Sequence, residues 1–267
     1  MMTSASAFHA LHAPGQLLLL ANAWDAGSAR LIESLGATAI ATTSCGVAWA
    51  QGYPDGDKLP VDRMVAAVAA IARVVRVPLT ADIEGGYADN RTRICEVVKM
   101  VIGAGAVGIN IEDGSGTPEH LADKIQAARS AGLQAGVSVF VNARTDVFLR
   151  GLVPDAARVE EVARRAARYA EAGADGLFVP GLADPADIAA VVAATALPVN
   201  VMALPTLPPL AALKALGVRR LSAGGSIAEA ALGTARRLAA AFLATGDCAG
   251  LRSGDGVGYG EMNALFG

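Results

Sequence analysis

Eight short apolar runs alternate along this chain with longer stretches that have the spacing of amphipathic helices. The runs cover residues 17–23, 37–43, 79–84, 107–112, 137–144, 176–179, 199–203 and 219–223. Short apolar runs indicate buried strands, and each stretch between them is long enough to return the chain to the edge where it started. Strand followed by helix, repeated eight times, predicts an α/β fold, a (β/α)8 TIM-type barrel. A doubly wound open sheet is the competing topology.

Glycine comes near the end of five helical stretches, shortly before the next apolar run, at Gly36, Gly105, Gly132, Gly173 and Gly217. Glycine is common just after a helix because it adopts the left-handed conformation without strain. We therefore expect helices to end at these five residues, and the strands that follow them to run in one direction.

No shift in composition marks an internal linker in the 267 residues. We predict a single barrel domain over residues 1–245, followed by a Gly-rich arm over residues 246–267. The arm ends in the apolar side chains of Met262, Leu265 and Phe266. These side chains are unfavourable in bulk water, so we expect the arm to dock on a neighbouring subunit, and a flexible appendix is the alternative.

The bulk composition excludes several classes of partner. The formal net charge is −3 and no basic stripe is present, so we expect no nucleic acid partner. Arg and Pro interrupt the apolar stretches before the ~18 residues that a membrane span needs, so we expect no membrane partner. The first residues lack the pattern of a secretory signal, which predicts a cytoplasmic location. Cys45, Cys95 and Cys248 lack metal-type spacing, which predicts reduced thiols and no zinc site.

Charged side chains close three of the apolar runs. Residues two apart in a strand share a face, so Asp82 and Glu84 would point away from the side of Ile83. Glu112 and Arg144 end the next two runs with the same alternation. At the carboxyl ends of parallel barrel strands these groups would converge. Three carboxylates beside a guanidinium predict a site for a hard divalent cation and an anionic substrate.

These residues belong to motifs that occur in a fixed order along the chain. The motifs are Trp24-Asp25-Ala26, Gly52-Tyr53-Pro54-Asp55, Thr80-Ala-Asp82-Ile-Glu84-Gly-Gly-Tyr87, Ile111-Glu112-Asp113 and Asn142-Ala-Arg144-Thr-Asp146. Together they resemble the isocitrate lyase and phosphoenolpyruvate mutase superfamily. The resemblance implies a barrel that binds Mg²⁺ and a small α-oxo or α-hydroxy carboxylate. It implies that C–C or P–C bonds are made or broken through a pyruvate-enolate-like species.

The resemblance also implies an assembly and a metal site. Members commonly exchange the last helix between paired subunits, so we expect a homo-oligomer that is a dimer of dimers, with its C-terminal helix exchanged. Asp82 matches the direct metal ligand, and Glu84 and Glu112 match the carboxylates that hold metal-bound waters. Mg²⁺ is the expected cofactor, with Mn²⁺ as an alternative. The competing interpretation is that the three acids pair with cationic side chains inside the barrel.

Further site residues follow from the same resemblance. Arg144 matches the residue that grips the substrate carboxylate, and its alternative is an internal salt bridge to Asp82 or Glu112. Asp55 matches an acid above the metal, with Tyr53 near it, so both are candidate catalytic residues. An ordinary exposed turn is the alternative for residues 54–57.

Substrate-binding residues are expected at the end of the second run. Thr43, Ser44, Cys45 and Gly46 lie where the superfamily has a Ser-Gly pair that holds the carboxylate, with Thr43 in the serine place. Asn200, on the seventh run, has a counterpart near the substrate, and its alternative is a buried amide that ties strands together.

Two departures from the superfamily pattern bear on the reaction. Lyases that cleave isocitrate or methylisocitrate carry a Lys-Lys/Arg-Cys-Gly-His motif after the fourth strand, and residues 114–120 contain neither its Cys nor its basic pair. The same lyases place a Glu after the sixth strand, and residues 177–181 lack it. We therefore expect a Mg-dependent C–C bond lyase on a small oxaloacetate-type acid. The alternatives are a P–C bond enzyme, meaning a phosphonomutase or a phosphonopyruvate hydrolase, and a non-catalytic metabolite-binding barrel.

Overall fold

The computed structural model of the protein describes residues 3–252 and 256–267, and it contains one parallel sheet with strand order β1-β9-β8-β7-β6-β5-β4-β3-β2. The strands are β1 (Leu18–Leu20), β2 (Asn22–Ala23), β3 (Ile40–Thr42), β4 (Leu79–Asp82), β5 (Gly108–Glu112), β6 (Phe140–Arg144), β7 (Gly176–Phe178), β8 (Val199–Met202) and β9 (Arg220–Ser222). Every pair of neighbouring strands is parallel.

The two edge strands of this sheet are consecutive segments of the first apolar run. The prediction of one strand over residues 17–23 is wrong, because the run is divided into β1 and β2 on either side of Ala21. β1 pairs with β9 and β2 pairs with β3, so the divided run closes the sheet on itself. The predicted TIM-type barrel is confirmed, and the open-sheet alternative is excluded.

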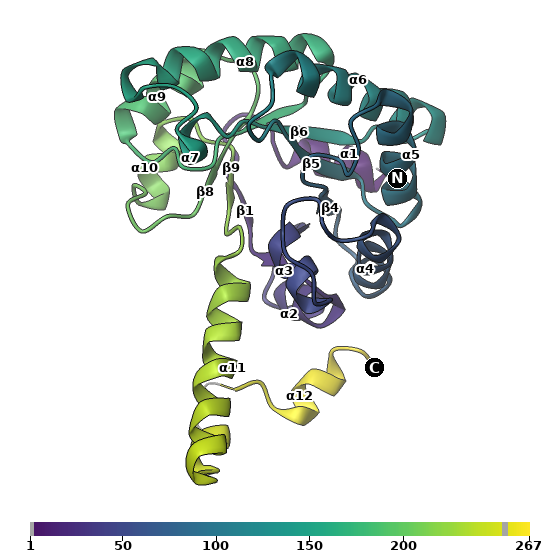
Figure 1. The fold of residues 1–267 in the computed structure, drawn as a ribbon, viewed down its shortest axis with the longest axis vertical. Helices are drawn as coiled ribbons and strands as arrows, with labels where there is room; N and C mark the ends of the chain where they lie inside the picture. The colour runs from purple at the N-terminus through teal and green to yellow at the C-terminus, as the bar shows by residue number, and fades with distance from the viewer. Residues whose placement is uncertain (1–2, 253–255) are drawn as a thin grey trace.

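Helices alternate with the strands along the chain, and most of them surround the barrel (Figure 1). They are α1 (Ser4–Ala10), α2 (Ala26–Ser34), α3 (Ser44–Ala50), α4 (Val61–Val74), α5 (Arg91–Gly103), α6 (Pro118–Ala135), α7 (Val147–Arg150), α8 (Arg158–Ala172), α9 (Pro185–Ala193), α10 (Leu210–Ala215), α11 (Ser226–Thr245) and α12 (Tyr259–Ala264), with 3-10 turns η1 (Asp155–Ala157) and η2 (Ala249–Arg252). None of the helices within the described ranges is long and apolar enough to cross a membrane.

Four of the five predicted helix stops are confirmed. Gly36, Gly105, Gly173 and Gly217 follow α2, α5, α8 and α10 with φ of 95°, 110°, 101° and 90°, in the left-handed region that glycine favours. The stop predicted at Gly132 is wrong, because α6 continues to Ala135. A Cβ atom at Gly132 would lie 2.8 Å from the carbonyl oxygen of Val137, so close packing accounts for the glycine there.

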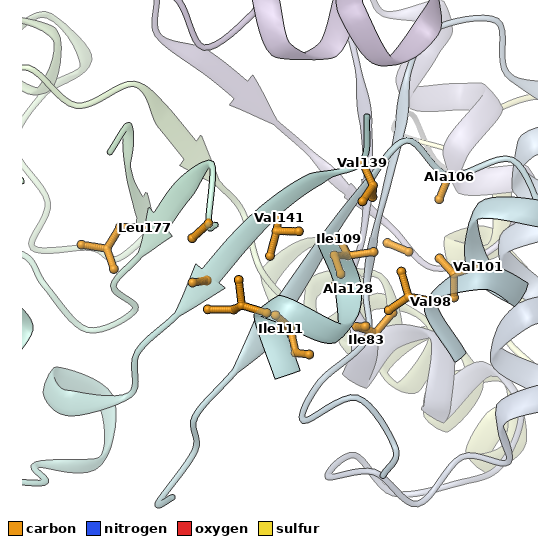
Figure 2. Close-up of a cluster of buried hydrophobic side chains, with 14 of the residues drawn as sticks. Ile83, Val98, Val101, Ala106, Ile109, Ile111, Ala128, Val139, Val141 and Leu177 are labelled. Carbon is orange, nitrogen blue, oxygen red and sulfur yellow. The ribbon is translucent and has the colours of Figure 1, made fainter. Parts of the chain in front are cut away.

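The hydrophobic core lies between the sheet and its helices. Figure 2 shows Ile109, Ile111 and Val141 on the sheet facing Val98 and Ala128 on the surrounding helices. Side chains alternate along a strand, so the intervening polar residues of β5 point into the barrel. The predicted alternation therefore holds for β5. Burial of aliphatic surface at about 25 cal/mol per Å² is what holds these strands to their helices.

The alternation fails at the end of the third run. β4 ends at Asp82, and Glu84 has a φ of 51°, in the left-handed region. The prediction that Glu84 continues the strand on the face of Asp82 is therefore wrong, because the chain turns between the two residues.

Helix α1 packs against the residues at the amino end of the barrel. Phe8 is fully buried, and its ring lies 5.4 Å from the ring of Phe140 in an edge-to-face arrangement. His12 stacks on the same Phe140 ring with a centroid distance of 4.0 Å. These rings close one end of the barrel, so access to its interior is left to the carboxyl ends of the strands.

The C-terminal segment departs from the barrel. Helix α11 extends away from it, and the chain then turns back through α12 toward α2 (Figure 1). The Nε atom of Arg30 on α2 donates to the carbonyl oxygen of Leu265 at 2.8 Å, so the arm contacts its own chain. Exchange of α11 between subunits remains a prediction. Residues 1–2 and 253–255, which fall in the predicted barrel domain and arm, lie outside the described residues.

Candidate active site

A cavity of about 130 Å³ opens among the carboxyl ends of the strands. It is lined by Asn22, Thr43, Ser44, Cys45, Asp55, Asp82, Asn110, Arg144, Phe178, Met202, Ser222, Gly224 and Gly225. Six of the residues predicted from the sequence are among them, namely Thr43, Ser44, Cys45, Asp55, Asp82 and Arg144. Glu84, Glu112, Gly46, Tyr53 and Asn200 lie around this cavity or beneath it rather than on its wall.

Asp82 ends β4 with its carboxylate in the cavity wall. Its backbone N–H donates to Thr42 Oγ1 at 2.8 Å, and its Oδ1 accepts from the Glu84 N–H at 3.3 Å. Burial raises the pKa of Asp82, and the positive charge of Arg144 opposes that shift. A buried carboxylate with a raised pKa is stabilised by any cation that comes close to it.

Arg144 ends β6 and is held between two carboxylates. Its Nη1 lies 2.7 Å from Glu112 Oε2, while its Nε and Nη2 donate to the two oxygens of Asp146 at 2.7 and 3.1 Å. The internal salt bridge considered as an alternative for Arg144 is therefore present, with Glu112 as its partner. Burial lowers the pKa of Arg144, but Glu112 and Asp146 outweigh burial and the net shift is upward.

Glu112 ends β5, next to Arg144 in the sheet. Burial raises the pKa of Glu112 to about 8, with the charge of Asp82 adding to the shift and that of Arg144 opposing it. The positive charge of Arg144 therefore compensates only part of the cost of burying an ionised Glu112.

A hydrogen bond to Asp113 fixes the position of Asp146 in turn. Its backbone N–H donates to Asp113 Oδ1 at 2.9 Å, and the other oxygen of Asp113 accepts from Arg165 Nη1 at 2.7 Å and the Tyr169 hydroxyl at 2.6 Å. The orientation of Arg144 thus depends on a buried set of charges that reaches α8.

Glu84 holds the turn that carries Asp55 into the cavity. Its Oε2 accepts from the backbone N–H groups of Gly56, at 2.7 Å, and Asp57, and its Oε1 accepts from the Tyr87 hydroxyl at 2.7 Å. Burial raises the pKa of Glu84, and these donors lower it. The structure therefore gives Glu84 a positioning role, and its contact with metal-bound water remains a prediction.

Residues 43–46 form the junction of β3 and α3. Thr43 precedes α3, and its Oγ1 lies 3.2 Å from Cys45 Sγ. Burial raises the pKa of the Cys45 thiol, which keeps it protonated and unsuited to nucleophilic attack. A Cβ at Gly46 would lie 2.8 Å from both Thr43 Cγ2 and Trp24 Cβ, so glycine permits this close packing.

Tyr53 and Asn200 lie away from the cavity wall. Tyr53 is partly buried and packs against the main hydrophobic core. Asn200 is fully buried, and its Nδ2 donates to the Val201 carbonyl at 2.7 Å. The alternative considered for Asn200, a buried amide that ties strands together, is what the structure contains.

Seven lining residues were not predicted as site residues, namely Asn22, Asn110, Phe178, Met202, Ser222, Gly224 and Gly225. Most of them lie at or just beyond the carboxyl ends of strands, so position in the barrel was the available signal. Asn22 accepts at Oδ1 from the Gly224 N–H at 3.0 Å. Phe178 lies beneath the guanidinium of Arg144, 5.7 Å from the ring centroid, in cation–π geometry.

The donor set fits Mg²⁺ better than a metal that needs a closed protein cage. Among the described residues no three His, Cys, Asp or Glu side chains converge to enclose an ion. Mg²⁺ keeps several of its waters and usually takes one or two carboxylates plus substrate oxygens. Burial raises the pKa values of Asp82 and Glu112, and a divalent cation beside these carboxylates would favour their ionised forms.

Comparison with known proteins agrees with this geometry. A proposed phosphonomutase from Burkholderia cenocepacia has a similar structure, with a TM-score of 0.84 and 43% identity over 88% of this chain and 98% of the other. Phosphonopyruvate hydrolase, solved with oxalate and Mg²⁺, has a TM-score of 0.83 and 28% identity over 99% and 95% of the two chains. An oxaloacetate decarboxylase of Ectopseudomonas mendocina is 28% identical over 97% of this chain and 87% of its own length.

The family model of phosphoenolpyruvate phosphomutase matches residues 8–243, which include the whole barrel and every residue that lines the cavity. The chain therefore belongs to the phosphoenolpyruvate phosphomutase family, within the isocitrate lyase and phosphoenolpyruvate mutase superfamily.

Proposed function

We propose that this protein is a Mg²⁺-dependent lyase that cleaves a C–C bond in a small 2-oxo or 2-hydroxy carboxylate of the oxaloacetate type. The observation that carries the proposal is the cavity, which combines the carboxylates of Asp55 and Asp82 with one guanidinium, that of Arg144. Its volume of about 130 Å³ is well below the roughly 300–1,000 Å³ of pockets for drug-sized ligands. A small, anionic, metal-chelating acid suits such a space.

The residues that would hold Mg²⁺ are Asp82, Glu84 and Glu112. When bound, the ion supplies Lewis-acid stabilisation of negative charge on the substrate. Arg144 is oriented by the two hydrogen bonds that it donates to Asp146, so its remaining N–H groups can bind a carboxylate without a loss of side-chain freedom at that moment. Thr43, Ser44 and Cys45 line the same cavity at the start of α3, so the Thr43 hydroxyl and the backbone N–H groups there are the donors that would stabilise developing charge.

P–C bond chemistry is the second candidate, because phosphonopyruvate hydrolase and a proposed phosphonomutase are among the relatives. A phosphonate carries more negative charge than a carboxylate and would require further cationic donors. Among the described residues, Arg144 is the single Lys or Arg on the cavity wall. This supports the carboxylate substrate. The buried carboxylates likewise argue against a barrel that only binds a metabolite.

The test is a turnover screen with Mg²⁺ on oxaloacetate, alkylated malates, methylisocitrate and phosphonopyruvate, in which pyruvate and phosphate are measured. Pyruvate without phosphate supports the proposal, provided that Asp82→Ala abolishes it. Asp123→Ala is the matched control, because the Asp123 side chain is 60% exposed and remote from the cavity. Phosphate release from phosphonopyruvate would establish the second candidate, and turnover that survives in Asp82→Ala would refute the metal site.

The expected assembly, a dimer of dimers with an exchanged C-terminal helix, is part of the same proposal. Helix α11 supports it, because Leu232, Phe242 and Leu243 are all exposed in the single chain, Leu243 by 81%. Light scattering of the whole chain, beside a variant with Leu232 and Leu243 changed to Lys, measures the assembly. A monomeric parent chain would contradict it.

A further inference from the structure

A buried arginine lies beneath the cavity without a carboxylate partner. Arg220 on β9 is 1% exposed, and no acidic group of the described residues lies within ion-pair distance of it. Its Nη2 donates to Asn110 Oδ1 at 3.0 Å, whereas its Nε and Nη1 are buried and have no acceptor. An unpaired guanidinium in a barrel interior is costly for folding. A role in the site above it would account for its presence.

Three buried amides connect Arg220 with the wall of the barrel, and fixed acceptors determine their orientation. Asn200 Nδ2 donates to the carbonyl oxygens of Val201 at 2.7 Å and Arg220 at 3.3 Å. Asn200 Oδ1 is therefore turned toward Asn142, whose Nδ2 donates to it at 3.1 Å. The same Nδ2 atom donates to Asn110 Oδ1 at 2.9 Å.

The oxygen of Asn110 thus receives donors from two sides. A guanidinium contains donors only, so the Asn110 atom that faces Arg220 must be the oxygen. A rotated amide would set an NH₂ group against both the guanidinium of Arg220 and the NH₂ of Asn142. The series of amides thus runs from the backbone carbonyls that fix Asn200 to the cation of Arg220. These two ends leave Asn110 with a single orientation.

This orientation turns the NH₂ group of Asn110 toward the cavity. Asn110 lines the cavity and is 5% exposed. Its Nδ2 has no acceptor within the described part of the chain, yet it is not one of the buried unpaired atoms, so the cavity reaches it. A guanidinium that donates to the oxygen of an amide polarises the amide and strengthens its N–H donors. The Asn110 NH₂ is therefore a strengthened donor that faces the place of an anionic substrate.

We propose that Asn110 donates a hydrogen bond to an oxygen of the bound oxo acid, and that Arg220 is the positioning residue that directs this donor into the cavity. This inference rests on the proposed function, because it takes the occupant of the cavity to be a small carboxylate. It adds a neutral donor beside Arg144 and explains why an arginine is retained in the barrel interior.

The experiment is calorimetric titration of the whole chain with oxalate in saturating Mg²⁺, together with the melting temperature of each variant. Asn110→Ala removes the donor and should weaken oxalate binding by roughly 10- to 100-fold, the range for one hydrogen bond to a charged group. Asn110→Asp keeps the shape and offers Arg220 a carboxylate. It should keep or raise the melting temperature while weakening oxalate at least as much. Asn263→Asp, on exposed α12, is the matched control and should bind as the parent does.

Arg220→Met tests the positioning role. It should weaken oxalate by a similar factor, and Arg220→Met combined with Asn110→Ala should be no more than about twofold weaker than the weaker single variant, because both remove one interaction. If Arg220→Met fails to fold, the oxalate affinity of Asn110→Asp still tests the hydrogen bond from Asn110. Oxalate binding by Asn110→Asp within twofold of the parent, or multiplicative losses in the double variant, would overturn the inference and leave the proposed function standing. A parent protein that binds no oxalate with Mg²⁺ would overturn both.

Discussion

Asp113 is the residue through which the fold controls the orientation of Arg144. Its side chain is fully buried and accepts three hydrogen bonds, from Arg165, Tyr169 and the backbone N–H of Asp146. In Asp113→Asn the charge is lost while the size is kept. Whichever way the new amide turns, its NH₂ faces a donor, either the guanidinium of Arg165 or the N–H of Asp146.

The size of the effect follows from these contacts. Removing one partner of a buried ion pair typically costs about 3–5 kcal/mol, because the other charge stays buried without compensation. Arg165 keeps Glu161 as a partner through its Nε, which favours the lower end of this range. At about 2–4 °C per kcal/mol for a chain of this size, the melting temperature should fall by roughly 6–20 °C. Tyr169→Phe deletes one hydrogen bond to the same carboxylate and should cost about 1.5–3 kcal/mol.

Urea unfolding followed by circular dichroism measures both variants, and turnover under the conditions of the substrate screen measures the consequence for the site. Asp146 loses its backbone tether in Asp113→Asn, so KM for the oxo acid should rise even at temperatures where the variant is fully folded. Asp123→Asn, on the exposed side of α6, is the matched control and should change neither quantity. A loss below about 1 kcal/mol in Asp113→Asn would refute the argument that this carboxylate is indispensable to the buried network.

Three further predictions concern the site and its supporting turn. Glu112 has a pKa of about 8 when folded and 4.5 as its ordinary value, so the folded chain binds the extra proton between these values. Without Mg²⁺, stability should therefore fall as pH rises from about 4.5 to 8, and Glu112→Gln should flatten this slope in pH-dependent melting curves. Arg144→Lys loses the paired bonds to Asp146 and should raise KM by roughly tenfold or more in steady-state kinetics, equivalent to about 1.4 kcal/mol. Gly86→Ala should cost roughly 1–3 kcal/mol in urea unfolding, because φ there is 92° and a Cβ would lie 2.5 Å from Ile94 Cδ1.

Each of these predictions has an outcome that would contradict it. Stability of the Mg²⁺-free protein that rises between pH 5 and 8 would mean that Glu112 ionises readily when buried. An unchanged KM in Arg144→Lys would show that the paired geometry is unnecessary. Gly103→Ala is the control for Gly86→Ala, because a Cβ at Gly103 meets nothing within 4 Å. Equal losses in both alanine variants would refute the steric argument.

The sequence alone was sufficient for the barrel and for the main charged groups of the site. Strand and helix periods are local properties, so the alternation of apolar runs and helical stretches predicted the architecture. Asp82 and Arg144 could be identified because they end regular strands, where the period of two decides the direction of a side chain. The split of the first run and the continuation of α6 through Gly132 were missed, because packing against distant residues determines both.

Only the tertiary structure decided how the polar groups are paired. Glu84 has a left-handed backbone conformation, so its side chain does not follow the alternation of the strand before it. Its carboxylate accepts from the backbone N–H groups of residues 56–57, and the residues next to Glu84 in the sequence do not indicate these partners. Asn110 and Arg220 are separated by 110 positions, and no local pattern indicates that one directs the amide of the other into the cavity. Hydrogen bonds need donor and acceptor within about 3 Å at a defined angle, and closure of the barrel is what brings such distant residues to that distance.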